Sequence, residues 1–122
     1  MIDFNVIIQH MKGILEDIGV KSSDNPARMA FDMERLIHRW SQRHVARICG
    51  LGNFGINNML ITEMGYAGRY GSFVIDAALP YNEYVMDEYC LYKSNGNCAV
   101  CVKACPTGAL TLDGFDRYKC YS

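Results

Sequence analysis

The side chains best suited to chemistry in this sequence are its six cysteines, four of which lie between Cys90 and Cys105. Cysteine thiolates bind metal ions and iron–sulfur clusters, whereas disulfides predominate in small exported proteins. Cys98, Cys101 and Cys105 follow one another at short intervals, and Pro106 comes directly after the last of them. This clustering favours metal or cluster ligation over disulfide bonds.

The spacing C-x2-C-x3-C-P favours an iron–sulfur cluster over zinc. Structural zinc sites usually contain two separated C-x2-C pairs, and this chain has one. Bacterial ferredoxin runs read C-x2-C-x2-C-x3-C-P, so the chain matches the last three cysteines and carries Asn95 at the first position. We therefore predict a [4Fe–4S] cluster held by Cys98, Cys101 and Cys105.

A fourth thiolate must come from elsewhere in the chain. Cys90 lies upstream of the run, and the Ser-Asn-Gly-Asn sequence at residues 94–97 predicts a turn that brings it back. Cys120 is the other candidate, while Cys49 is far away in the sequence and is expected to be a small buried residue. One cubane needs four thiolates and two need eight, so the six cysteines can complete one cluster. A second cluster would need ligands outside the chain.

Composition limits the classes of function. The formal net charge is −1, which argues against a dedicated nucleic-acid-binding protein. No apolar run approaches the roughly 18–20 residues that span a bilayer. The first residues lack the basic segment and apolar run of a signal peptide, so we expect a cytoplasmic protein.

A glycine-rich motif offers a second, weaker lead. Gly50, Gly52 and Gly55 match the dinucleotide-binding pattern G-x-G-x-x-G, with residues 45–49 as a conceivable preceding strand. The following helix would be very short, and no further βα units remain before the cysteines. We therefore interpret these glycines as a tight turn beside a bulky ligand or a packed helix.

Periodicity predicts the elements that position these residues. Residues 3–18 have the apolar spacing of an amphipathic helix, with Asp3 as its cap and Gly19 at its end, and residues 21–25 form a polar loop. A second helix is expected from Asn25-Pro26, with strands at residues 59–62 and 72–79. The predicted fold is α+β: helices and a small antiparallel sheet in residues 1–80, then a ferredoxin-like cysteine-rich segment in residues 81–122. The apolar stripe of the second helix comprises Met29, Met33, Leu36, Ile37 and Trp40.

Taken together, these features resemble the epoxyqueuosine reductase-like and reductive dehalogenase-like iron–sulfur proteins. The resemblance covers residues 40–120 and implies a nitroreductase-like region that holds a corrinoid such as cobalamin, fed with electrons by two [4Fe–4S] clusters. It places Cys98 and Cys101 on one cluster, and Cys105 and Cys120 on the other. The segments that carry it, besides the cysteines, are residues 41–46, Gly50-Leu51-Gly52 with Gly55 and Asn57, residues 60–62, Gly65 with Arg69, and residues 73–76.

The resemblance also implies roles and partners. The residues expected to contact the corrinoid are Gly50, Gly52, Gly55, Asn57 and Arg69. Leu36 occupies the position of the family's catalytic aspartate, so epoxyqueuosine reduction is not carried over to this chain. We expect electron transfer through a cluster held by Cys98, Cys101 and Cys105 with Cys90 or Cys120. The partners would be a redox protein or the remainder of a parent reductase, a second copy of the chain, and tRNA only by analogy with the family.

Two alternatives remain open from the sequence. The chain could be a non-enzymatic module stapled by zinc or disulfides instead of an electron carrier. Arg35, Arg39, Arg43 and Arg47 recur every four residues. We interpret them as the solvated face of a helix, and the alternative is an edge that binds the phosphates of a corrinoid or of RNA.

Overall fold

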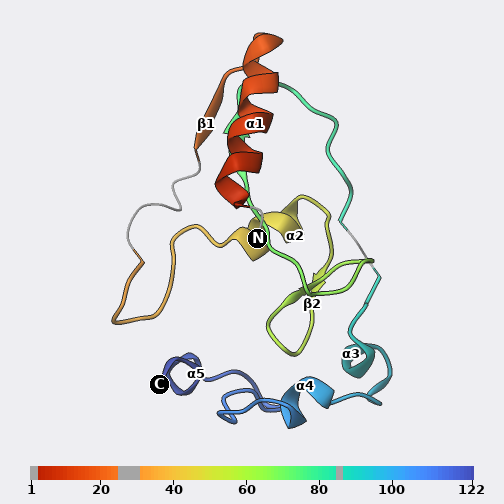
Figure 1. The fold of residues 1–122 in the computed structure, drawn as a ribbon. Coiled ribbons are helices and arrows are strands. Elements are labelled where there is room, and N and C mark those ends of the chain that lie inside the picture. The colour runs from red at the N-terminus through yellow and green to blue at the C-terminus, as the bar shows by residue number, and fades with distance from the viewer. Residues whose placement is uncertain (1–2, 25–30, 85–86) are drawn as a thin grey trace.

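The computed structural model describes residues 3–24, 31–84 and 87–122. It combines helices with two separate two-stranded antiparallel sheets, β1–β4 and β2–β3, which confirms the α+β class. The long helix α1 lies at one end of the molecule, and the cysteine-rich segment with α3, α4 and α5 lies at the other (Figure 1). The elements are α1 (Phe4–Asp17), β1 (Ser22–Asp24), α2 (Gln42–Ile48), β2 (Asn53–Phe54), β3 (Leu60–Ile61), β4 (Phe73–Ile75), α3 (Leu91–Asn95), α4 (Val100–Lys103) and α5 (Arg117–Tyr121).

Helix α1 forms as its sequence predicts. The Asp3 side chain accepts a hydrogen bond from the Asn5 N–H at 2.9 Å, satisfying a donor that the first helical turn leaves unpaired. Gly19 follows the helix with φ +77°, and its N–H donates to the Glu16 carbonyl. Both ends are therefore set by local chemistry, as expected from the sequence.

The sheet beneath α1 is only partly as expected. Residues Ser22–Asp24, predicted as a loop, form β1 and pair with Phe73–Ile75, which is shorter than the predicted strand at 72–79. A polar three-residue strand has no apolar alternation by which its sequence could predict it. It forms through its pairing with β4, which is remote in sequence. Lys12 of α1 forms a salt bridge of 2.9 Å with Asp24, which fastens the helix to β1.

The predicted second helix is wrong where the structure describes it. Asn25, Pro26 and Met29 lie outside the described residues. From Phe31 to Trp40 the chain makes a turn in which Asp32 and Ile37 exchange backbone hydrogen bonds of 3.0 and 3.3 Å.

An aspartate explains why this segment is not a helix. The Asp32 side chain accepts from the backbone N–H groups of Glu34 and Arg35, at 3.1 and 2.9 Å. Such side-chain bonds offer the backbone an alternative to helical pairing. Leu36, with φ +50°, then turns the chain back toward Ile37.

Helix α2 begins later, at Gln42, and its arginines hold the neighbouring hairpin. Arg43 donates to the Asn58 carbonyl, and the Arg47 guanidinium donates to the Asn53 side chain at 3.3 Å. Since Arg35 and Arg39 precede α2, the four arginines do not share one helix face. The interpretation as a continuous solvated helix face is therefore wrong.

The β2–β3 hairpin contains the best-buried of the residues that the structure describes. Leu60 in β3 has 0% exposure, and Ala46 in α2 has 4%. The Tyr70 hydroxyl donates to the Leu60 carbonyl at 3.2 Å. Residues 59–62 were predicted to form a strand, and Leu60–Ile61 confirm it.

No helix in the described part of the chain has the length and apolar character needed to cross a membrane.

Gly52 allows the hairpin to close. A Cβ atom at this position would collide with the backbone of Ile61 and Thr62. Gly13, in the middle of α1, provides a contrast, because a Cβ there would meet nothing within 4 Å. The two glycines therefore differ in whether the fold requires them.

We predict opposite effects of alanine at these two glycines. Gly52→Ala should lower the free energy of unfolding by about 1–3 kcal/mol because the backbone of β3 must move. Gly13→Ala should raise it by about 0.5–1 kcal/mol, since alanine suits a helix interior better than glycine. Urea unfolding followed by circular dichroism measures both, and equal stability of Gly52→Ala and the natural chain would contradict the packing argument.

Candidate functional site

The structure places five cysteines in one segment at the end of the molecule remote from α1 (Figure 1). Cys90 precedes α3 and is buried, with 8% exposure. Cys98, Cys101 and Cys105 are partly buried on and around α4, and Cys120 is exposed on α5. The three cysteines of the ferredoxin-type run therefore lie on one short continuous stretch, with the other two at either side in sequence.

The turn predicted after Cys90 is present. Helix α3 ends at Asn95, and Gly96 adopts φ +75° while its N–H donates to the Tyr92 carbonyl at 2.8 Å. The Asn95 side chain then accepts from the Asn97 N–H at 2.9 Å. Asn95, which replaces the first cysteine of the ferredoxin run, thus shapes the turn that leads into Cys98.

Cys105 has the most developed environment among these thiols. Its sulfur accepts a hydrogen bond from the Leu110 backbone N–H at 3.4 Å and lies 3.8 Å from the Thr107 hydroxyl oxygen. Pro106 directs the chain into a turn in which the Gly108 N–H donates to the Cys105 carbonyl, at 3.1 Å. The C-P-T-G sequence therefore folds back over its own cysteine.

These contacts favour the thiolate. The Leu110 N–H is the largest influence and lowers the pKa of Cys105 below its ordinary value; partial burial opposes it, and the Thr107 hydroxyl adds to it. A thiolate is the form of cysteine that binds iron, and hydrogen bonds to ligand sulfurs tune a cluster's potential. The backbone N–H of Leu110, assisted by the Thr107 hydroxyl, thus makes Cys105 better suited to ligation.

A small core supports this turn. Ala109 has 1% exposure and Leu110 8%, and Leu110 pairs with Phe115 through an isolated bridge. The Asp116 side chain accepts from two N–H groups of the first turn of α5, at 3.0 and 3.1 Å. The turn at Cys105 and the helix that carries Cys120 are therefore joined by one short hairpin.

The ligand set itself stays a prediction. Among the residues that the structure describes, no three His, Cys, Asp or Glu side chains are grouped so that they could hold a metal ion. The donor types nevertheless fit a cluster, because all five are thiols and hydrogen bonding lowers the pKa of Cys105.

Cys49 departs from its expected role. It was predicted to be a small buried residue, but it is exposed directly after α2. Its carbonyl accepts a hydrogen bond from the Asn82 side chain at 3.5 Å. The end of a helix commonly faces solvent, and sequence distance from the other cysteines carries no information about burial.

The glycine motif is explained by packing within the chain. Gly50 has φ +75°, and a Cβ there would lie 2.6 Å from the Glu83 carbonyl oxygen. A Cβ at Gly55 would lie 2.6 Å from the Ile61 side chain, and Gly52 abuts β3 as described above. Protein atoms thus occupy the space beside all three glycines.

The remaining residues of the predicted cofactor set lie apart from the cysteines in sequence. The Asn57 side chain accepts from the Met59 N–H at 3.1 Å, within the hairpin turn, and Arg69 is exposed. Helix α2 precedes the glycines and strand β2 follows them, the reverse of a dinucleotide-binding strand–turn–helix. This order excludes a dinucleotide-binding βαβ unit at these glycines.

Two cationic side chains that sequence reasoning missed connect the cysteine segment to the rest of the chain. Lys93 of α3 donates to the Phe54 carbonyl in β2, and Arg117 of α5 donates to the Arg35 carbonyl at 3.3 Å. No periodicity or motif marks either residue, because backbone carbonyls as partners leave no trace in a sequence.

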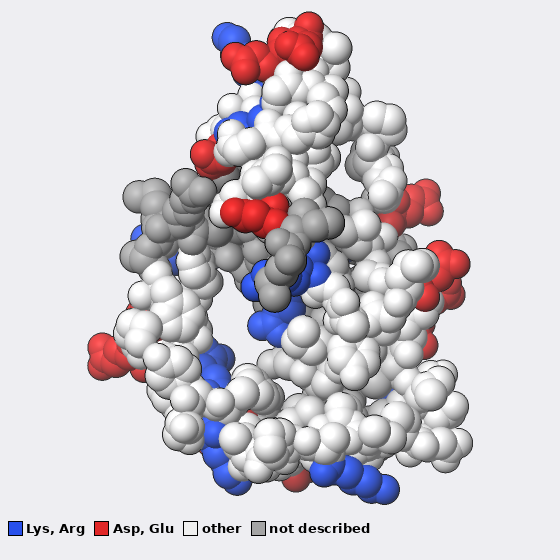
Figure 2. Space-filling view, viewed as in Figure 1, with Lys and Arg blue, Asp and Glu red and all other residues white. Residues whose placement is uncertain are grey.

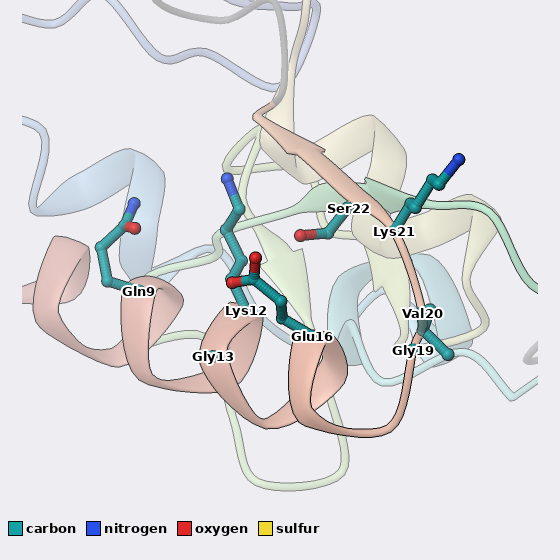
Figure 3. Close-up of a pocket in the computed structure, with 8 residues that line it drawn as sticks. All are labelled: Gln9, Lys12, Gly13, Glu16, Gly19, Val20, Lys21 and Ser22. Atoms are coloured by element: carbon teal, nitrogen blue, oxygen red, sulfur yellow. The ribbon is translucent and has the colours of Figure 1, made fainter.

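A pocket of about 650 Å³ lies between α1 and β1, away from the cysteines (Figure 3). Its polar groups include Lys12, whose ammonium already pairs with Asp24. The pocket is lined by Gln9, Lys12, Gly13, Glu16, Gly19, Val20, Lys21 and Ser22. None of these side chains is a redox group or a nucleophile of the predicted site.

Comparison with known proteins yields one informative relationship. No family model matches the chain, and no solved structure matches it. The chain is similar to epoxyqueuosine reductase of Bacillus subtilis (strain 168), with 30% identity over 122 residues. The alignment covers 98% of this chain but 29% of the relative, so the chain spans less than a third of that protein's length. These figures support a distant relationship to epoxyqueuosine reductase.

Proposed function

We propose that this chain binds a [4Fe–4S] cluster and transfers electrons as part of a reductase. The observation that carries the proposal is the Cys105 sulfur, which accepts a backbone hydrogen bond inside a C-x2-C-x3-C-P turn. A buried structural cysteine has no need of a stabilised thiolate, whereas a cluster ligand does. The distant relationship to a reductase agrees with a redox role.

The proposed ligands are Cys98, Cys101, Cys105 and Cys90. We favour Cys90 over Cys120 because it is buried, and burial protects a cluster from solvent. A turn at Gly96 separates Cys90 and α3 from the run that begins at Cys98. When bound, the cluster would accept and release one electron at a time, while the protein sets its potential through the Leu110 N–H and through burial.

The corrinoid implied by the resemblance fits this chain less well. The space beside the glycines expected to contact it is occupied by Glu83, Ile61 and the β3 backbone. The activity, substrate and tRNA partner of the full-length relative also depend on parts that this chain does not align with, since it covers 29% of that protein. We therefore assign the chain electron delivery and no step of epoxyqueuosine reduction, with a redox protein or the remainder of a larger reductase as partner.

The competing function is a module stapled by zinc. Four cysteines in one segment satisfy the donor chemistry of a structural zinc site as well as that of a cluster. The single C-x2-C pair and the C-x3-C-P continuation remain the reason to prefer iron. The two functions differ in composition and colour, so one preparation separates them.

We predict about four iron atoms and about four acid-labile sulfides per chain after anaerobic purification, as for one cubane. The protein should be brown and should lose this colour on oxidation in air. Iron, sulfide and zinc are measured on the same sample. One zinc per chain without sulfide would establish the stapled module instead.

Single serine substitutions rank the ligands. Cys101→Ser should reduce iron content to less than about a tenth of the natural level, because a cubane rarely survives the loss of a thiolate from its central loop. Cys49→Ser is the matched control and should leave iron unchanged. Comparing Cys90→Ser with Cys120→Ser then identifies the fourth ligand, which we expect to be Cys90. Full cluster content in Cys90→Ser, with loss in Cys120→Ser, would reverse that assignment.

A further inference from the structure

The sulfur of Cys105 lies between two hydrogen-bond donors, and one of them is a side chain. The Leu110 backbone nitrogen lies 3.4 Å from the sulfur, and the Thr107 hydroxyl oxygen lies 3.8 Å from it. The Leu110 donor belongs to the backbone, so a change of side chain leaves it in place. The Thr107 hydroxyl is therefore the contact at this thiol that the choice of residue decides.

A further contact sets the orientation of the Thr107 hydroxyl. Its oxygen accepts a hydrogen bond from the Ala109 N–H at 3.3 Å, and Ala109 is buried with 1% exposure. Because the oxygen acts as the acceptor in that bond, its own proton is free to point at the Cys105 sulfur. The β-branched side chain of threonine has few favourable χ1 rotamers, which helps to hold the hydroxyl in this place.

A donor at a ligand sulfur shifts the potential of a cluster in a definite direction. The reduced cluster carries one more negative charge than the oxidised cluster, so its ligand sulfurs are stronger hydrogen-bond acceptors. A hydroxyl that donates to such a sulfur stabilises the reduced form more than the oxidised form. The reduction potential rises as a result.

We propose that Thr107 acts through Cys105 as a positioning residue, and that its hydroxyl raises the reduction potential of the bound cluster. The inference rests on the proposed function, because it needs a cluster at Cys105. It adds to that function a side chain that sets how readily the cluster accepts an electron.

Surface charge is another influence on such a potential, and a neutral substitution leaves it unchanged. The edge of the molecule that contains the cysteine segment, lowest in the view of Figure 2, shows Lys and Arg atoms among uncharged ones. Exchanging threonine for valine alters none of these charges. Because Thr107 is exposed, the exchange also disturbs no buried packing. A shift of potential in this variant therefore reports the hydroxyl.

Potentiometric titration of the anaerobically purified chain, followed by the electron paramagnetic resonance of the reduced cluster, tests the proposal. Thr107→Val should lower the potential. At a fixed applied potential the ratio of reduced to oxidised cluster should fall about threefold to tenfold, and tenfold corresponds to about 59 mV for a one-electron couple. Thr107→Ser retains the hydroxyl and should keep the natural potential.

Thr111→Val is the matched control. Thr111 is exposed in the same short hairpin, but its hydroxyl donates to the Gly114 carbonyl at 3.2 Å instead of to a sulfur. The same substitution there should leave the potential unchanged. Equal shifts in Thr107→Val and Thr111→Val would contradict the proposal, because they would indicate a general loosening of the hairpin.

Iron and sulfide measured on the same samples separate this inference from the cluster assignment. A natural chain without a cluster would overturn the proposed function, and this inference with it. A full cluster whose potential is the same in Thr107→Val would overturn the role of the hydroxyl alone. Thr107→Ala also lacks the hydroxyl and should lower the potential as valine does. Loss of the cluster in both variants would show a role in assembly and would likewise refute the effect on potential.

Discussion

The burial of Leu60, in β3, against α2 is the interaction on which the middle of this fold depends. Leu60 is a large side chain with 0% exposure, and few other residues that the structure describes are buried. Two close contacts hold the strand that carries Leu60. Gly52 lies directly against the β3 backbone, and the Tyr70 hydroxyl donates a hydrogen bond to the Leu60 carbonyl. A short hairpin is marginal alone, so the helix against it supplies the missing stability.

Long cationic side chains extend this centre to the rest of the molecule. Arg43 holds the hairpin turn, Lys93 connects α3 to β2, and Arg117 connects α5 to the turn before Trp40. Each donates to a backbone carbonyl rather than to a carboxylate. Hydrogen bonds from charged groups are stronger than neutral ones, and this compensates in part for a small apolar core.

The cysteine segment depends on a core of its own. Ala109 and Leu110 are buried behind the turn at Cys105, and the Leu110 N–H that faces the sulfur is fixed by the same hairpin. Packing and thiolate stabilisation thus come from one residue. A cluster bound here would join Cys90 to the run from Cys98 to Cys105, and metal binding of this kind contributes directly to folding.

The sequence by itself determined the features that depend on near neighbours. Helix α1 with its Asp3 cap, the strand at Leu60–Ile61, the turn at Gly96 and the C-x2-C-x3-C-P run all follow from local capping, periodicity or turn chemistry. Tertiary structure decided the rest, because the deciding partner is remote. Strand β1 exists through β4, Gly50 through Glu83, and Lys93 through Phe54. The predicted helix near Trp40 failed because the Asp32 side chain bonds backbone groups that a helix would also use. Periodicity records which side chains are apolar, but it does not record which hydrogen bonds the backbone finds elsewhere in the fold.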